Sequence, residues 1–585
     1  MSMLVGAASP ALANCTVGKI AELPVTMSDM QPLVPAKIND VEVMLEADSG
    51  AFYSALSPST VAEQHLPRQI APFGFSIVGV GGAVDPYLTT VKTFTLAGVP
   101  IRNVEFIVSP GAGGQAAGLM GQNVLGLADV EYDFAHGVIR LIKAQGCNGV
   151  ALAYWDRSQR FSTMDLDMPA TERIDGTTGE AYLNGKRIQV QFDTGAGMSM
   201  MSLAAARRAG IDISSSDVEP GGYSWGIGHR LVNTWIVRVA SFKVGDEEIK
   251  NARIRVGDTS LPQSDMLLGA DFFQSHRVYV ANSQHKLYFT YNGGPVFDLA
   301  AKSLVQDGVN GPVTDSVVST ADGPEPKDAD GFSRRGAALM SRGEFERAIA
   351  DLDKACALAP AEPRYLVERG GAHWRNQQPF LAMADFDAAL KLKPDYAEAL
   401  MQRAELELTG NDAAAAVADF DAVDHALPKD ADMRLALGHL YDRADRRGAA
   451  IGQYDLWIAS HQDEALAAPV LNNLCWDRAV LGRELDLALK NCDRALRANA
   501  KSPDVLDSRG MVYLRLGQYD KSIADYDAAL TQRPSLAWSL YGRGLAKQRL
   551  GRTSEGQADL DAALALMPDL PEKARAYGLV AAPTK

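Results

Sequence analysis

Two short motifs, DSGA at residues 48–51 and DTGA at residues 193–196, contain the side chains with the clearest chemical potential. Each motif begins with an aspartate. One carboxylate cannot both take a proton from water and give one to a leaving group. Two carboxylates that share one proton can do both, because the ionised one is a base and the protonated one is an acid. Like charges held that close force one pKa upward, so such a pair titrates as a unit.

The residues before each motif predict a β-strand that ends at the aspartate. Apolar residues occupy every second position of 41–47 and of 188–192. This alternation buries one face of each strand. The aspartate then falls in a tight turn that the following glycine permits. Glu46 faces away from the side of Ala47 in this pattern, and we expect it to leave the strand undisturbed.

The surroundings of the two motifs correspond in order as well as in type. FTLAGVPIRNVEFIV (94–108) matches FKVGDEEIKNARIRV (242–256), and GLMGQNVL (118–125) matches MLLGADFF (266–273). Asp48 and Asp193 lie 145 positions apart (48 to 193). We therefore interpret the first 300 residues, which are rich in short alternating runs and in turn residues, as a tandem duplication of an all-β lobe.

The paired motifs, the Gly-rich segments IVGVGG (77–82) and SWGIGH (224–229), and the later apolar-apolar-glycine segments resemble the retropepsin-like aspartic peptidases. The resemblance covers roughly residues 20–150 and 175–295. It implies acid-protease-like lobes that face each other as a pseudo-twofold pair, with Asp48 and Asp193 as catalytic residues. A water between them would attack a peptide carbonyl, without metal or cofactor.

The resemblance also assigns supporting and substrate-binding positions. Ser49 and Thr194 would tie the two active-site loops together. The loops would be supported by Ser49, Gly50, Ala51, Thr194, Gly195, Ala196, Gly121 and Gly269. Two flaps would hold an extended substrate with Val78, Gly79, Val80, Gly81, Trp225, Gly226, Ile227 and Gly228. His229 could touch substrate or be a surface-loop histidine. Alanine, not serine, ends both motifs, which predicts a mildly acidic to near-neutral optimum.

Residues 331–570 show a different pattern, with helical periodicity and a 34-residue repeat. The step is kept by Gly336, Gly370, Ala404 and Gly438, by Pro360, Pro394 and Pro428, and after a four-residue slip by Trp476, Gly510 and Gly544. The pattern resembles the tetratricopeptide repeat (TPR). Seven repeats and a capping helix with a tail (571–585) are predicted. The resemblance implies an all-α solenoid whose concave face binds a protein or peptide partner.

Two charged ladders run along the predicted solenoid. Arginines precede the small residue of the first helix, and aspartates recur on the second: Arg335, Arg369, Arg403, Arg509, Arg543; Asp353, Asp387, Asp421, Asp455, Asp493, Asp527, Asp561. Two interpretations remain open. The ladders could pair within the solenoid, or the arginines could line a clamp for acidic segments.

Composition sets the remaining limits. The net charge of −15 argues against a nucleic-acid partner, and no apolar run is long enough to span a membrane. Residues 1–14 resemble the end of a signal peptide, so we expect export to the periplasm or the exterior, or a cytoplasmic location if this segment is no signal. The lobes are predicted at 15–155 and 156–298, followed by a flexible linker at 299–330.

The cysteines allow two pairings. Cys15 and Cys147 bracket the first lobe, and Cys475 and Cys492 fall on neighbouring predicted helices. In an oxidising compartment both pairs could be disulfides, while buried free thiols are the alternative. The spacing matches no zinc site. The function hypotheses are an aspartic endopeptidase that recruits its substrate through the repeats, or a non-catalytic scaffold that binds peptides.

Overall fold

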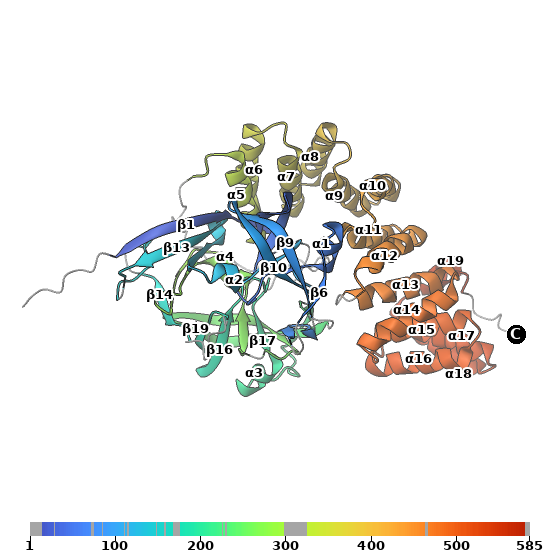
Figure 1. Cartoon of the computed structure of the whole chain (residues 1–585). Helices are drawn as coiled ribbons and strands as arrows, with labels where there is room; N and C mark the ends of the chain where they lie inside the picture. The colour runs from blue at the N-terminus through green and yellow to red at the C-terminus, as the bar shows by residue number, and fades with distance from the viewer. Residues whose placement is uncertain are drawn as a thin grey trace, which may run out of the picture. The chain divides into compact units, whose positions relative to one another are not determined.

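The computed structural model describes residues 15–28, 30–71, 75–84, 86–109, 111–113, 116–147, 149–156, 160–167, 176–224, 226–227, 231–261, 263–297, 325–462 and 466–579. The chain forms two compact units, residues 1–394 and 395–585. Every described strand lies in the first unit, and helices make up the second (Figure 1). The predicted fold class is confirmed: tandem all-β lobes precede an all-α repeat region. The predicted signal remnant and most of the predicted linker lie outside the described residues.

The first lobe is a closed eight-stranded sheet. Its spatial order is β2 (Thr26–Ser28), β3 (Gln31–Ile38), β4 (Val41–Ala47), β11 (Gly118–Met120), β5 (Ala55–Leu56), β10 (Val99–Val108), β9 (Tyr87–Leu96) and β6 (Gln69–Ile70). Pairing of β3 with β9 closes the sheet into a barrel. The hairpin of β7 (Ile77–Gly79) and β8 (Gly82–Val84) stands apart from this sheet. Leu45 and Ala47, on the predicted inward face of β4, are fully buried.

The second lobe repeats this plan with seven strands. The order is β15 (Thr178–Leu183), β16 (Lys186–Phe192), β21 (Met266–Leu268), β17 (Met200–Ser202), β20 (Glu247–Gly257), β19 (Val232–Val244) and β18 (Glu219–Ser224). Here β15 pairs with β19 to close the barrel. Short helices complete the two lobes: α1 (Pro58–Glu63), α2 (Gln122–Leu125), the 3-10 turn η1 (Phe134–His136), α3 (Leu203–Arg208) and α4 (Ala270–Ser275).

A third sheet joins the lobes and was not predicted. Its six strands run β1 (Thr16–Pro24), β13 (Val138–Gln145), β12 (Asp129–Asp133), β22 (His276–Ala281), β23 (Lys286–Tyr291) and β14 (Ser162–Asp165). The junction is the antiparallel pairing of β12 with β22, which come from the two copies of the duplication. One face of this sheet packs on the core that both lobes share, through side chains such as Tyr132 and Val278. The lobes are therefore one folding body.

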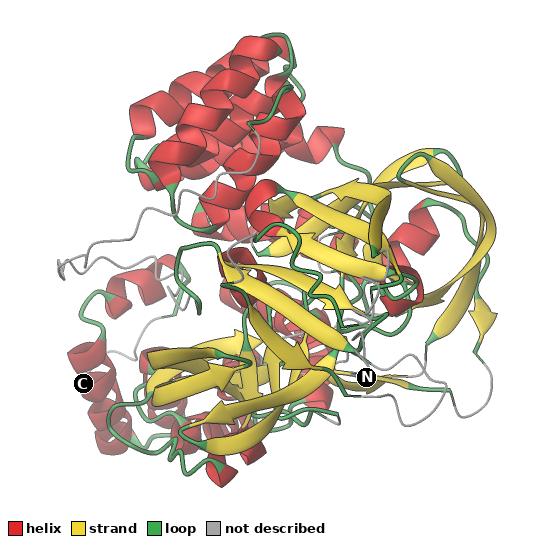
Figure 2. Cartoon of the chain, turned by 90° about the vertical axis from the view of Figure 1, so that its left-hand side faces the viewer, coloured by secondary structure: helices red, strands yellow, loops and turns green. Residues whose placement is uncertain are grey.

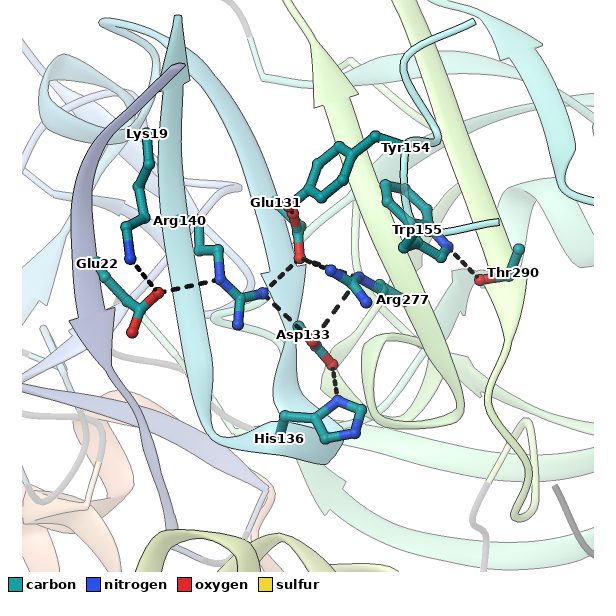
Figure 3. A network of polar contacts seen from close by, with 10 residues as sticks. All are labelled: Lys19, Glu22, Glu131, Asp133, His136, Arg140, Tyr154, Trp155, Arg277 and Thr290. Atoms are coloured by element: carbon teal, nitrogen blue, oxygen red, sulfur yellow. Dashed lines mark hydrogen bonds and ion pairs between the residues drawn. The ribbon is translucent and has the colours of Figure 1, made fainter. Parts of the chain in front are cut away.

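A buried ionic network ties the same two strands on the outer face of the sheet (Figure 3). Glu131 of β12 is fully buried, and its Oε1 accepts hydrogen bonds from Arg277 Nε (2.9 Å) in β22. Arg140 of β13 donates to the same oxygen at 2.5 Å, and the Tyr154 hydroxyl donates to Oε2. The Arg277 guanidinium lies 4.7 Å from the centre of the Trp155 ring. A buried carboxylate needs such partners, because an unpaired charge there would be costly.

The remaining helices form antiparallel hairpins, seven of them within residues 325–462 and 466–579 (Figure 2). The first unit contains α5 (Ala329–Ser341), α6 (Phe345–Leu358), α7 (Pro363–Arg375) and α8 (Pro379–Leu392). The second contains α9 (Ala397–Thr409), α10 (Ala413–Ala426), α11 (Met433–Arg443), α12 (Arg447–Ser460), α13 (Ala467–Leu481), α14 (Leu485–Ala498), α15 (Pro503–Arg515), α16 (Tyr519–Gln532), α17 (Ala537–Arg549), α18 (Thr553–Leu566) and α19 (Leu570–Ala576). None of the described helices has the length and apolar character to cross a membrane.

Close approach within a hairpin explains the repeated glycine. A Cβ on Gly438 would lie 2.8 Å from the Tyr454 ring atom Cδ1, and one on Gly510 would lie 2.8 Å from Tyr526 Cε1. An aromatic ring of the second helix thus occupies the space that a larger first-helix residue would need. The small residues that mark the 34-residue period are a packing requirement.

The arginine ladder is engaged in ion pairs along the hairpins. Arg509 donates from Nε to Asp525 of its own hairpin (2.7 Å) and from Nη1 to Asp493 of the preceding one (2.9 Å). Arg369 and Arg543 repeat both contacts, and Arg335 and Arg403 repeat the contact within the hairpin. The partners within a hairpin lie two positions before the predicted aspartate ladder, whereas Asp353, Asp493 and Asp527, which pair with the arginine of the next hairpin, belong to it. These contacts favour pairing within the solenoid over a clamp for an acidic ligand.

Two disulfides are present. Cys15 bonds to Cys147 beside the shared sheet, and Cys475 of α13 bonds to Cys492 of α14. Of the two alternatives that the sequence left open, disulfides and buried free thiols, the structure has the disulfides at both pairs. The first disulfide connects the start of β1 to the residues that follow β13. The second connects the two helices of the α13–α14 hairpin.

Candidate active site

The aspartates are positioned by strands that end side by side within each lobe. Strand β4 runs parallel to β11, and β16 runs parallel to β21. The Asp48 N–H donates to Met120 O (3.0 Å), and the Asp193 N–H donates to Leu268 O (2.9 Å). The same register in both lobes therefore fixes each aspartate at the mouth of its barrel, as the duplication predicts.

Hydroxyl groups connect the two active-site loops across the lobes. The Ser49 N–H donates to Thr194 Oγ1 (2.9 Å), and the Thr194 N–H donates to Ser49 Oγ (3.0 Å). Each hydroxyl then donates to the strand of the opposite lobe, Ser49 to Phe192 O (2.9 Å) and Thr194 to Ala47 O (2.6 Å). Both side chains are buried. Four reciprocal hydrogen bonds fix the separation of the loops and hence that of the carboxyl groups.

The carboxyl groups lie against each other's loops. A Cβ added to Gly50 would overlap the Asp193 carboxyl, and one added to Gly195 would overlap the Asp48 carboxyl. Each Oδ1 also accepts two backbone N–H groups: Gly50 (2.9 Å) and Ala51 (2.8 Å) at Asp48, Gly195 (3.0 Å) and Ala196 (3.1 Å) at Asp193. Glycine is required at both positions because only a bare Cα leaves room for the opposing carboxylate.

Gly121 and Gly269 brace the loops from behind. A Cβ on Gly121 would lie 2.8 Å from Ala51 O, and one on Gly269 would overlap Ala196 O. The next residues, Gln122 and Ala270, donate their N–H groups to the same carbonyls at 2.8 and 2.7 Å. The predicted supporting residues are thus brought together at one place in both lobes.

The two aspartates form an electrostatically coupled pair. Burial raises the pKa of both carboxyl groups, and the hydrogen bonds from the backbone only partly oppose it. After burial, the charge of Asp48 is the largest cause that raises the pKa of Asp193, well above the usual aspartate range. The pair therefore retains one proton at a pH where two independent aspartates would have lost both.

Glu46 contributes a third carboxyl group to the site, whereas the sequence pattern predicted only that it would leave the strand undisturbed. Alternation holds as predicted, so Glu46 lies on the face of β4 opposite Leu45 and Ala47, but its side chain is buried. Burial is the main cause that raises its pKa well above the usual range, and the charges of Asp48 and Asp193 raise it further. Gln31 Nε2 donates to it at 3.3 Å. The sequence sign of this third carboxyl group was the acidic residue two positions before Asp48, where an apolar residue is usual.

The first flap is the β7–β8 hairpin, whose tip meets the second lobe. The Gly81 N–H donates to Ile227 O (2.9 Å), and Thr259 Oγ1 donates to Val80 O (3.0 Å). Gly79 packs against Ile227 so closely that a Cβ would clash, while the neighbouring Val78 is half exposed. Gly226 lies beside them, within reach of Gly111. The predicted flap residues Trp225 and Gly228, with His229, lie outside the described residues.

Two β-barrels that meet at a half-buried pair of aspartates, whose loops are joined by hydrogen bonds, define the class of this region: an aspartic-protease-like pair of lobes. The match to known families agrees. Residues 34–124 and 179–272 each match a family model described as aspartyl protease. Residues 510–551 match a model described as TPR repeat, and residues 333–397 and 368–431 match one described as tetratricopeptide repeat. The resemblances inferred from the sequence are confirmed.

Several solved structures are similar to part of the chain. One is a tetratricopeptide repeat protein from Parabacteroides merdae ATCC 43184, 16% identical over 43% of this chain and 98% of that chain, with a TM-score of 0.31. A second is the Cut9–Hcn1 hetero-tetramer of APC/C. It is 15% identical over 43% of this chain and 48% of that chain, with a TM-score of 0.30. A third is YrrB, described as a TPR protein with an unusual peptide-binding site. It is 17% identical over 39% of this chain and 98% of that chain, with a TM-score of 0.23. Our search of curated proteins returned no match.

Proposed function

We propose that the chain is an aspartic endopeptidase that hydrolyses peptide bonds with Asp48 and Asp193 of one molecule. The observation that carries this proposal is the mutual contact of the two loops: each glycine backbone lies against the opposite carboxyl group, and Ser49 and Thr194 lock that arrangement. One chain therefore supplies both halves of the acid–base pair.

In the proposed reaction the ionised carboxylate takes a proton from a water held between the aspartates. The resulting nucleophile attacks the peptide carbonyl, and the protonated carboxyl donates to the developing oxyanion. The carboxyl group that took the proton from water then gives it to the amide nitrogen as the C–N bond breaks. One hydroxyl of the tetrahedral intermediate returns its proton to the other carboxylate, so the pair is again singly protonated. The raised pKa of Asp193 supports this cycle because it keeps the shared proton in place in mild acid.

The flap fits an extended substrate. Its strands end at Gly79 and begin again at Gly82, and the tip between them is hydrogen-bonded to the second lobe through the Gly81 N–H and the Val80 carbonyl. We propose that opening of the Gly81–Ile227 and Thr259–Val80 contacts admits the substrate, which then pairs along the flap. The helical repeats would recruit a protein substrate or a partner.

We also propose that the protein works outside the cytoplasm. Both described disulfides support this location, because disulfides persist in the periplasm or extracellular space and are rare in reducing compartments. A signal at the N-terminus would direct the export.

Hydrolysis of a mixed peptide library tests the activity. Wild-type protein should release new N-termini, and a pepstatin-type inhibitor should block the release. Asp48→Asn and Asp193→Asn should each lower kcat by at least about a hundredfold, because each removes one partner of the acid–base pair. Asp212→Asn, which removes an exposed carboxylate of the second lobe, is the matched control and should retain full activity.

A wild-type protein that is folded by circular dichroism yet cleaves no library member would contradict the proposal. So would a single aspartate variant that keeps full activity. Either result would favour a scaffold whose lobes bind extended peptides without cleaving them.

A further inference from the structure

The second unit contains a hollow of about 510 Å³ that the active site does not use. It lies along α13, α15 and α17, the first helices of three consecutive hairpins, and is closed at one end by Leu566 and Met567 at the end of α18. A cavity of this size can hold a large side chain together with part of the backbone that carries it.

Two indole rings contribute to the apolar part of the hollow, together with aliphatic side chains. Trp476 of α13 and Trp538 of α17 meet edge to face, with 5.6 Å between ring centroids. Such rings provide broad contact area, and the face of an indole attracts a cation. Trp538 also packs on Tyr541 and Tyr577, which hold its ring in place.

The polar part is rich in hydrogen-bond acceptors and negative charge. Asp504 and Asp507 of α15 line the hollow, and the described lining residues include no lysine or arginine. Asn472 Oδ1 is buried and has no hydrogen-bond partner among the described residues. A ligand with several N–H donors would satisfy this acceptor, whereas a carboxylate would be repelled by the aspartates.

The two aspartates differ in how they are already engaged. Asp504 is half exposed and forms an ion pair with Arg533 at the rim. Asp507 accepts the Ser539 hydroxyl and has no ion-pair partner among the described residues. Burial is the main cause that raises its pKa to about 7; Asp504 also raises it, whereas the Ser539 hydrogen bond and Arg533 lower it. Tyr526 of α16 is the other titratable group near it.

The positive charges of the same helices are occupied elsewhere. Arg509 and Arg543 are bonded to aspartates of the second helices, as described above. Arg515 donates to the carbonyls of Ala479 and Val480. The groups that remain to bind a ligand in the hollow are therefore acceptors and carboxylates, which favour a ligand with N–H donors and positive charge.

We propose that this hollow binds a lysine or arginine side chain of an extended protein segment that the repeats recruit. The cation would lie against the indoles and pair with Asp507, and Asn472 would accept a further N–H. This inference rests on the proposed recruiting role of the repeats and gives that role a charge preference: basic, not acidic, segments.

Binding of short peptides to the full chain tests the inference. The protein carries Asp48→Asn, so that bound peptides are not cleaved and the outcome does not depend on catalysis. Three fluorescent, N-acetylated and C-amidated heptapeptide pools share random flanks and differ only in the central residue, which is lysine, glutamine or glutamate. Blocked termini exclude binding through a free amine or carboxylate.

The lysine pool should bind at least about tenfold more tightly than the other two at pH 8, since an ionic hydrogen bond is lost in each replacement. Asp507→Asn should remove most of this preference, and Asp520→Asn, which neutralises an exposed carboxylate of α16 outside the hollow, should keep it. Binding should weaken from pH 8 to pH 5.5 as Asp507 takes up a proton, and Asp507→Asn should flatten that dependence.

Absence of binding to every pool would overturn the inference, and so would equal binding of the three pools. A preference that survives Asp507→Asn would also overturn it. Failure of the peptidase is distinguishable, because it would appear only in the cleavage assay with wild-type protein. A lysine preference without cleavage would leave the inference standing and remove the proposed catalytic role.

Discussion

At the scale of single residues, Glu46 changes the proton balance of the aspartate pair. Three carboxyl groups act on one another at the site: the charges of Asp48 and Asp193 raise the pKa of Glu46, and the charge of Asp48 raises the pKa of Asp193. Because such charge effects are reciprocal, an ionised Glu46 raises the pKa of the aspartate pair in turn. The cluster therefore extends the pH range over which one proton stays between the aspartates. Folded-state pKa values above the unfolded ones also mean that these groups stabilise the fold less as the pH rises.

Glu46→Gln should move the upper limb of the pH profile of kcat/KM to lower pH. Without the negative charge of Glu46 beside it, the aspartate pair should lose its shared proton at a lower pH, and activity ends with that loss. Glu42→Gln, an exposed position of the same strand, is the control. The measurement is the rate of cleavage of one library substrate between pH 3 and pH 8. An unchanged upper limb in Glu46→Gln would show that Glu46 does not take part in the proton balance.

At the scale of elements, the same packing rule appears in several helical hairpins, whereas the hairpin of α13 and α14 has Trp476 at the corresponding position. A first-helix glycine or alanine lies under a bulky residue of the second helix, and Gly438 under Tyr454 is the closest described example in the second unit. The arginine pairs then connect one hairpin to the next. Local sequence period and long-range packing therefore agree, which explains why the repeats could be predicted residue by residue.

Substitutions at two glycines of the α11–α12 hairpin distinguish the effect of packing on stability from that of helix propensity. Gly438→Ala should lower the stability of the repeats by about 1–3 kcal/mol, because the new methyl group must displace the Tyr454 ring. Gly452→Ala, exposed on α12 with no atom within 4 Å of the new Cβ, should raise it by about 0.5–1 kcal/mol. Urea unfolding followed by circular dichroism measures both. Equal shifts in the same direction would contradict the packing explanation.

At the scale of the whole molecule, some features followed from the sequence and others did not. The duplicated lobes, Asp48, Asp193 and the loop hydroxyls were predictable, because their patterns repeat at matched positions. The six-stranded sheet was not, because pairing of β12 with β22 joins strands about 150 residues apart and leaves no local signal. The charge of the hollow in the repeats was also missed, since Asp504 and Asp507 lie outside the repeating ladders.

The most direct test of the account is a titration of the aspartate carboxyl carbons by ¹³C NMR in wild-type protein and in Asp193→Asn. We expect Asp48 and Asp193 of the wild type to titrate in two linked steps, with the upper step well above the ordinary aspartate range. In Asp193→Asn that upper step should disappear. Two independent titrations near the ordinary aspartate pKa, unchanged for Asp48 in the variant, would contradict the shared proton and with it the proposed peptidase.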